Sequence, residues 1–205
     1  MSEWWTYQLS DFLMFAPSTY WRLIELYNRA LWPLQLLALA VGGGAFWLAK
    51  QRHPAADCGL MLLLAAVWLW VGWAFHWQRY ASINLLAPYA GAAFALQGLL
   101  LLLLLLGTGL WPQRRLEVGR GVIRQRFGGL LASVGLLYPL AGLLAGRPLW
   151  QAEVFGLVPE PTALVTLGLL LLSRYPMARA GRWLLLVIPL LSLLLGAATH
   201  RTFSG

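Results

Sequence analysis

Long apolar runs separated by short polar gaps dominate the chain. A helix needs about 20 mostly apolar residues to cross the hydrocarbon layer of a membrane. Six runs of about that length cover residues 30–49, 58–77, 85–111, 127–146, 154–173 and 182–199. The pattern predicts an all-α integral membrane protein, a six-helix transmembrane bundle. It also predicts two regions, an N-terminal interfacial segment over 1–29 and a six-span membrane domain over 30–205.

The stretch before the first run has apolar residues at helical spacing. Its apolar face contains Tyr20, Leu23, Ile24, Tyr27 and Leu31, and its polar face contains Arg22, Glu25, Asn28 and Arg29. This pattern predicts an amphipathic helix over residues 18–29 that lies in the membrane interface and does not cross it. Glu25 and Arg29 are four residues apart, a spacing at which oppositely charged side chains pair.

Residues 158–162, Val-Pro-Glu-Pro-Thr, interrupt the fifth apolar run. Proline lacks a backbone donor and disfavours helical geometry in the residue before it. We therefore expect a broken fifth segment that is non-helical over residues 154–160, with a helix beginning at Pro161. Such a helix would be about 20 Å long, too short to cross the membrane alone. Non-helical backbone at membrane depth requires cover by protein or a water-filled cavity.

Glu160 is the carboxylate that this break would place inside the membrane, and an ionisable group there indicates a functional site. The alternative is a helix that starts in the interface, with Glu160 capping it in water. The candidate substrate-binding residues are Glu160, Pro159, Pro161, Thr162, Arg79, His76 and Glu153. Arg79, and after it His76, are the expected partners of Glu160, since both end a run on the same side of the membrane.

A metal site is a second interpretation of the ionisable residues. His76, His200 and Glu160 are expected at similar depth, and two histidines with a carboxylate can bind zinc. No local ligand spacing such as HExxH supports that site, and two interfacial histidines with ordinary hydrogen bonds are the favoured explanation of the pattern. The sequence requires no cofactor.

Three stretches carry a family resemblance: YWRLIELYNRALWP, RYASINLLAPYAGAAFALQ and VFGLVPEPTALVTLGLLLL. Together they resemble an uncharacterised domain-of-unknown-function family of small bacterial multi-span membrane proteins. The resemblance covers nearly the whole chain. It implies a multi-pass protein of the bacterial inner membrane and brings no established activity.

Composition agrees with a membrane location. The 205 residues are 60% hydrophobic and 11% charged, against roughly 25% charged residues in soluble domains. The net charge of +8 lies in short gaps between apolar runs, which indicates topology charges beside anionic lipid and no nucleic-acid partner. The single cysteine, Cys58, excludes an internal disulfide bond.

Two functions fit these observations. The first is a small-solute or ion transporter or channel with its site at the broken fifth segment. The second is a non-catalytic accessory or assembly subunit of a larger membrane complex. An enzyme is less favoured, because the sequence has no phosphate-binding loop and no nucleophile elbow. The expected partners are membrane lipid and either a second copy of the chain or a membrane complex.

The distribution of basic residues predicts the orientation in the membrane. The gaps after the first, third and fifth runs hold ten of the 15 basic residues, and basic loops stay on the cytoplasmic side. The first 15 residues lack the features of a signal peptide, so we expect the first span to direct insertion. Both termini should be periplasmic. Reporter fusions should give a cytoplasmic signal at Gly119 and a periplasmic signal at Gly205, and a cytoplasmic signal at Gly205 would contradict this orientation.

Overall fold

The computed structural model describes residues 15–51, 54–107, 121–173 and 179–203. Over these residues the chain is helical and contains no strand. The α-helices are α1 (Pro17–Ala30), α2 (Leu34–Leu48), α3 (Pro54–Trp70), α4 (Ala87–Gly107), α5 (Val122–Leu144), α6 (Pro159–Leu172) and α7 (Arg179–Phe203). The shorter segments are a π-helix, η3 (Val71–Trp77), and two 3-10 helices, η4 (Tyr80–Ser82) and η5 (Leu149–Gln151).

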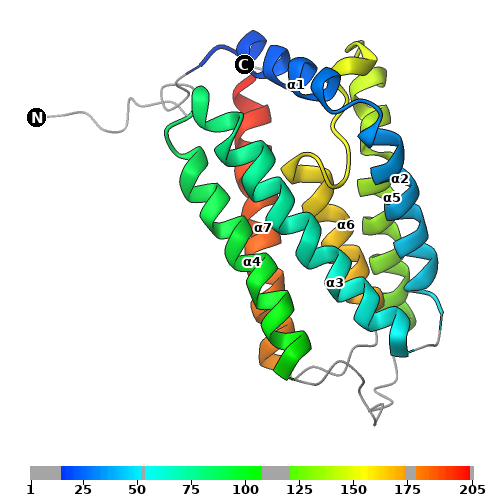
Figure 1. The fold of residues 1–205 in the computed structure, drawn as a ribbon. Coiled ribbons are helices and arrows are strands. Elements are labelled where there is room, and N and C mark those ends of the chain that lie inside the picture. The colour runs from blue at the N-terminus through cyan, green and yellow to red at the C-terminus, as the bar shows by residue number, and fades with distance from the viewer. Residues whose placement is uncertain (1–14, 52–53, 108–120, 174–178, 204–205) are drawn as a thin grey trace, which may run out of the picture.

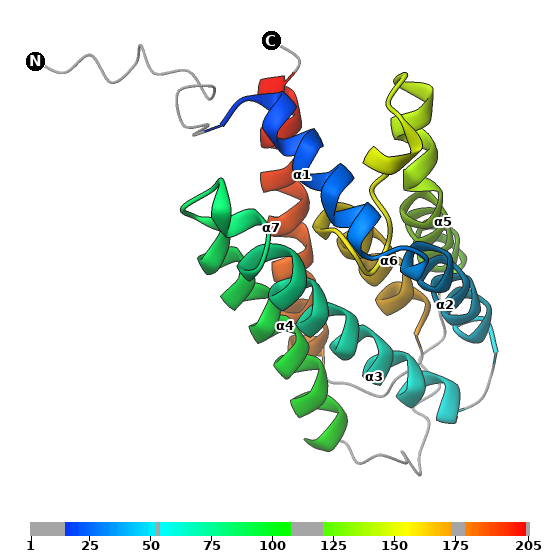
Figure 2. The ribbon, with the colours of Figure 1, turned by 45° about the horizontal axis from the view of Figure 1, so that its top comes forward.

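Helices α2 to α7 form a bundle, and α1 lies across one end of it (Figures 1 and 2). Successive helices alternate in direction, so that α1, η4, η5 and the end of α7 share that end (Figure 1). We call it the α1 end. The chain bends by 87° between α1 and α2, which lets α1 cover the bundle while α2 joins it. Helix α6 begins inside the bundle, below the α1 end (Figure 1).

Four helices of the described ranges are long and apolar enough to cross a membrane. They are Ala55–Ser82, which joins α3 to the segments after it, Ala87–Gly107, Val122–Leu144 and Ala180–Phe203. The number becomes five if the bent pair of α1 and α2 counts as one span. The runs predicted at 30–49 and 154–173 contain shorter helices of 15 and 14 residues, α2 and α6. Four of the six predicted spans therefore have full-length helices.

Helix α1 matches the predicted amphipathic helix closely. Tyr20, Ile24 and Tyr27 are buried on its inner face. Glu25 pairs with Arg29 at 3.1 Å, as predicted, and also with Arg22 at 3.0 Å. The placement of Asn28 on the polar face was wrong: Asn28 is 2% exposed, because its amide bonds the chain that α1 covers.

The fifth segment is broken, as predicted, but its helix begins two residues earlier than expected. Residues 154–158 are non-helical and buried, and α6 starts at Pro159 after an extended Val158. The first backbone N–H groups of a helix have no partner within it. Both Pro159 and Pro161 therefore fit in the first turn, and Glu160 lies between them, where the helix dipole favours an anion.

Helices α5 and α6 are in close contact through small residues. A Cβ added to Gly168 of α6 would collide with the backbone nitrogen of Ala132 in α5, and one added to Gly135 would lie 2.8 Å from the backbone nitrogen of Val165. Small residues at such positions let helix backbones approach inside a membrane. This contact holds α6 although it is too short to be anchored at both membrane surfaces.

We predict that Gly168→Ala destabilises the protein, because backbone atoms of Ala132 cannot move away as a flexible side chain would. The cost should be about 1–3 kcal/mol, typical of overpacking. The melting temperature of the purified protein in detergent should fall. Gly129→Ala is the matched control on α5, since a Cβ there meets nothing within 4 Å. Equal melting temperatures for the two variants would contradict the role of this contact.

Candidate functional site

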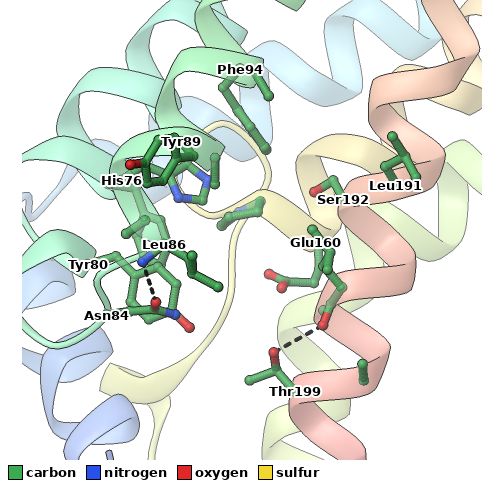
Figure 3. Close-up of a pocket in the computed structure, with 18 of the residues that line it drawn as sticks. His76, Tyr80, Asn84, Leu86, Tyr89, Phe94, Glu160, Leu191, Ser192 and Thr199 are labelled. Atoms are coloured by element: carbon green, nitrogen blue, oxygen red, sulfur yellow. Dashed lines mark hydrogen bonds between the residues drawn. The ribbon is translucent and has the colours of Figure 1, made fainter. Parts of the chain in front are cut away.

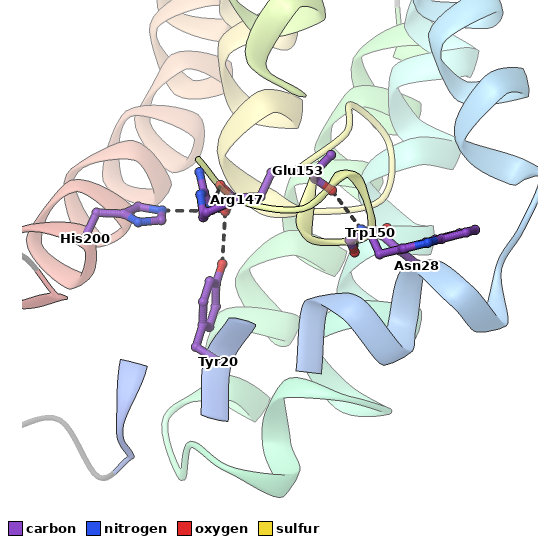
Figure 4. A network of polar contacts seen from close by, with 7 residues as sticks. Tyr20, Asn28, Arg147, Trp150, Glu153 and His200 are labelled. Atoms are coloured by element: carbon purple, nitrogen blue, oxygen red, sulfur yellow. Dashed lines mark hydrogen bonds and ion pairs between the residues drawn. The ribbon is translucent and has the colours of Figure 1, made fainter. Parts of the chain in front are cut away.

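A buried carboxylate, Glu153, organises the polar contacts at the α1 end (Figure 4). It lies between η5 and α6, and its side chain is 1% exposed. The Tyr20 hydroxyl donates to its Oε1 at 3.2 Å. Arg147 pairs with Oε2 at 3.4 Å, and His200 Nε2 lies 3.5 Å from Oε1. Glu153 thus joins α1, the chain after α5 and the end of α7.

A second set of contacts fixes α1 to the same segment. The Asn28 side-chain nitrogen donates to the carbonyl oxygens of Trp150 and Ala152, each at 2.8 Å. The Arg147 guanidinium lies 3.8 Å from the ring centroid of Trp21 on α1, a favourable cation–π geometry. Helix α1 therefore donates hydrogen bonds to two carbonyl groups of the segment between α5 and α6.

Part of the backbone of residues 154–158 is hydrogen-bonded locally. The N–H groups of Leu157 and Val158 donate to the Val154 carbonyl at 3.1 and 3.2 Å. The Thr162 hydroxyl accepts from the Gly156 N–H at 2.9 Å and donates to the Val158 carbonyl at 2.6 Å. Gly156 has a φ of +78°, which glycine adopts without strain. These bonds and the turn at Gly156 direct the segment into the bundle toward α6.

A cavity of about 550 Å³ lies where this segment meets α4 and α7 (Figure 3). Its walls come from α1, η3, η4, α4, the start of α6 and the half of α7 nearer the α1 end. The residues that line it include Tyr20, Phe75, His76, Tyr80, Leu86, Tyr89, Phe94, Pro159, Glu160, Leu191, Ser192, Leu195, Gly196 and His200. The lining is mostly apolar and aromatic, with few polar groups, as is usual for small-molecule sites.

Glu160 enters this cavity from the first turn of α6 (Figure 3). Its carboxyl group packs against Gly196 of α7, where an added Cβ would lie 2.5 Å from Oε1 and 2.7 Å from Cγ. The other oxygen, Oε2, is buried and accepts no hydrogen bond from any described residue. A buried polar atom without a partner is costly, so the Glu160 carboxyl group has hydrogen-bonding capacity that the described residues do not use.

His76 faces the same cavity from η3 (Figure 3). It is 4% exposed, and within the described residues neither ring nitrogen has a hydrogen-bond partner. Its ring lies 4.6 Å from that of Phe94 and 5.3 Å from that of Phe75, centroid to centroid. Short π-helical segments occur frequently at functional sites. Two walls of one cavity thus each present a side chain with a buried polar atom that no described residue satisfies.

The structure brings together some of the predicted site residues and separates others. Glu160, Pro159, His76 and His200 line the cavity, as their predicted depth suggested. Arg79 is exposed, lies outside the cavity lining and forms no ion pair with Glu160. Glu153, Pro161 and Thr162 are buried beside the cavity, and Glu153 and Thr162 serve the structural contacts described above. Among the described residues no three His, Cys, Asp or Glu side chains form a group that could hold a metal ion.

Several residues of the site have no recognisable signal in the sequence. In the sequence, Tyr20 is one of several apolar positions of an amphipathic helix, and Arg147 is one of the basic residues between apolar runs. Gly196 reads as one small residue in a leucine-rich helix. Their roles depend on contacts with residues that are distant in the chain, such as the 133 positions between Tyr20 and Glu153. Only Glu160 and His76 stand out locally, as ionisable residues within or at the end of apolar runs.

Over the described residues the protein is all-helical, with four or five helices of membrane-spanning length and a cavity between them. The chain belongs to the family of unknown function DUF6064, whose model matches residues 17–204. The predicted resemblance to an uncharacterised family is therefore confirmed. The comparison with curated proteins found no match. The comparison with solved structures found none either.

We predict that Glu153→Gln destabilises the protein strongly. The variant removes the charge that Arg147 and His200 face, and breaking a buried ion pair typically costs about 3–5 kcal/mol. The melting temperature in detergent should fall by several degrees. Glu25→Gln is the control, because it removes one ion-paired carboxylate from the outer face of α1 and should change the melting temperature little. A Glu153→Gln protein as stable as Glu25→Gln would show that the cluster does not hold α1.

Proposed function

We propose that this protein is a small-solute or ion transporter or channel of the bacterial inner membrane, with its binding site in the cavity at Glu160. One observation carries the proposal: a carboxylate and an imidazole face one cavity among membrane-length helices, each with a buried polar atom that no described residue satisfies. A protein interior rarely retains such groups without a role. Intramembrane ionisable groups typically mark substrate pathways.

The broken fifth segment supports the same proposal. Helices interrupted within the bundle form the binding sites of many transporters, where the exposed helix end contacts the substrate. Helix α6 begins below the α1 end and directs Glu160 into the cavity (Figures 1 and 3). The hydrogen bonds of Thr162 and Asn28 keep the chain before it fixed, so the carboxylate is presented by a rigid element.

We further propose six crossings with both termini in the periplasm. Here α2 and α6 count as crossings although they are short, and the alternating directions of α2 to α7 support this count (Figure 1). The described helix ends opposite α1 carry five basic residues, Lys50, Arg124, Arg126, Arg179 and Arg182, which favour the cytoplasmic side. The cavity would then lie in the periplasmic half of the membrane.

Transport can be tested in proteoliposomes by solid-supported-membrane electrometry. The panel contains sodium, potassium, tetramethylammonium, glycine and acetate. At least one should give a current above that of empty liposomes. Glu160→Gln should reduce that current about tenfold or more, because it removes a charge-assisted contact worth ~1.5 kcal/mol or more. Glu25→Gln should leave it unchanged.

The accessory-subunit alternative gives a different outcome. In that case the native protein should purify with other subunits at fixed stoichiometry, and the isolated chain should give no current with any solute of the panel. That combination would contradict the transport proposal. A folded Glu160→Gln variant with undiminished current would contradict the site.

A further inference from the structure

We propose that the cavity binds an amphiphilic amine, a molecule with a cationic ammonium head and an apolar chain, and admits it sideways from the membrane between α4 and α7. The inference rests on the proposed function, because it names the substrate class of the same site. It follows from where the cavity opens, how deep Glu160 lies and which groups surround it.

The mouth of the cavity is apolar. Four lining residues are exposed: Leu86 and Tyr89 on the α4 side, 65% and 75% exposed, and Leu191 and Leu195 on α7, 52% and 65% exposed. No charged residue shares this rim. Both helices are long and apolar enough to span the membrane, so this side of the protein faces lipid. Three leucines at the mouth offer a water-soluble solute no polar contact, whereas an apolar chain is stabilised by packing against them.

The end of the cavity toward α1 is covered by aromatic rings. Tyr20 on α1 packs against Tyr80 and Phe203, with ring centroids 5.9 and 5.4 Å apart. Phe15 packs against Tyr80 at 5.8 Å, and Trp21 stacks on His200 at 5.6 Å. Because Glu153 and Asn28 hold α1 in place, this cover is fixed. Entry between α4 and α7 is therefore easier than entry from the α1 end.

The splay of α4 and α7 explains why the mouth exists. The Gln97 side-chain nitrogen donates to the Leu185 carbonyl at 2.9 Å, and a Cβ on Gly181 would touch Leu104 at 3.2 Å. These contacts join the two helices in the half away from α1. Toward α1, the carboxyl group of Glu160 and the cavity separate them.

The depth of Glu160 suits the head group of an amphiphile. Glu160 packs on Gly196, seven residues before Phe203 at the end of α7. At 1.5 Å per residue this is about 10 Å below the end of the helix. Amphipathic molecules keep their charged end near the interface and their chain in hydrocarbon. An ammonium group at Glu160 would place the chain at the leucine-lined mouth.

The lining groups favour a cation over an anion. Glu160 Oε2 can accept a hydrogen bond from an ammonium N–H, and His76 offers a further acceptor on the opposite wall. The rings of Tyr80, Phe75 and Phe94 add faces that attract cations. Of the nearby cations, Arg147 is paired with Glu153 and packed on Trp21. His200 contacts Glu153 and interacts electrostatically with Glu160 as well. An amine bound at Glu160 would supply the hydrogen-bond donor that Oε2 does not find among the described residues.

The experiment measures binding of radiolabelled decylamine to the protein in phosphatidylcholine nanodiscs, corrected for empty nanodiscs. Decan-1-ol has the same chain and an uncharged head, and methylamine has the head without the chain. We expect decylamine to bind at least about tenfold more tightly than either, which corresponds to a difference of about 1.4 kcal/mol in binding free energy. Glu160→Gln should weaken decylamine binding about tenfold and leave decan-1-ol unchanged.

A second variant protects the test against misfolding. Gly196→Ala keeps the charge but displaces the carboxyl group, so it should also weaken decylamine binding, whereas Gly129→Ala should not. Undiminished binding in both Glu160→Gln and Gly196→Ala would overturn the proposal. So would decan-1-ol or methylamine binding as tightly as decylamine. Competition by added phosphatidylethanolamine would identify a lipid head group as the source of the amine, and lack of competition a free amine.

The two proposals can fail separately. If potassium or glycine currents depend on Glu160 while decylamine does not bind, the transport site stands and the substrate class is wrong. If decylamine binds in a Glu160-dependent manner but no solute gives a current, the amine site stands and transport of the tested solutes is wrong.

Discussion

The chain before α6 is non-helical and lies inside an apolar bundle, so its backbone groups need hydrogen-bond partners from elsewhere. The rest of this structure depends on that constraint. Residues 152–158 enter the bundle without helical bonds, and unpaired backbone groups there would each cost several kcal/mol. Three sources supply hydrogen bonds to this segment. The Val154 carbonyl accepts from N–H groups within the segment. The Thr162 hydroxyl of α6 accepts from the Gly156 N–H, and the Asn28 amide of α1 donates to the Ala152 carbonyl. Helix α1 lies across the bundle because that is where Asn28 and Tyr20 reach this segment (Figure 4).

The same constraint creates the cavity. Because residues 152–158 occupy the part of the bundle that a full-length helix would fill, α6 begins late and is 14 residues long. Helices α4 and α7 contact each other in the half away from α1 and separate where α6 starts. Gly196 leaves room on α7 for the Glu160 carboxyl group. A broken helix, a splayed pair and one glycine thus produce a space of about 550 Å³ without any long loop. The close contact of Gly168 with α5 then keeps the short helix from sliding.

The sequence predicted features that depend on local chemistry. The amphipathic spacing around Tyr20 and Ile24 identified α1, and the two prolines identified the break before α6. The error of two residues at Pro159 is physical, because the first turn of a helix tolerates several residues without N–H donors. The placement of Asn28 and the pairing of Arg79 with Glu160 failed for a different reason. The spacing of residues along a helix predicts its faces, but it does not show which polar groups lie beneath the covered face and can bond Asn28. Likewise, Arg79 and Glu160 can lie at a similar depth in the membrane and still be far apart in the bundle. The cavity, and the roles of Arg147 and Gly196, depend on which helices become neighbours, and six similar apolar runs carry little information about that.

Two carboxylates seven residues apart show how packing separates a structural charge from a candidate functional one. Both follow α5, both are largely enclosed, and both lay within the same predicted site. Glu153 meets a hydroxyl, a guanidinium and an imidazole within 3.5 Å, so its charge is used in holding three elements together. Glu160 has a glycine against one oxygen, and its other oxygen is buried without a hydrogen-bond partner among the described residues. Arg147 pairs with Glu153, and His200 contacts Glu153 while also interacting electrostatically with Glu160. Even so, no described residue donates a hydrogen bond to Glu160 Oε2. The packing of α6 against α7 leaves that oxygen without a hydrogen-bond partner, and this arrangement makes sense if the partner arrives from outside the chain.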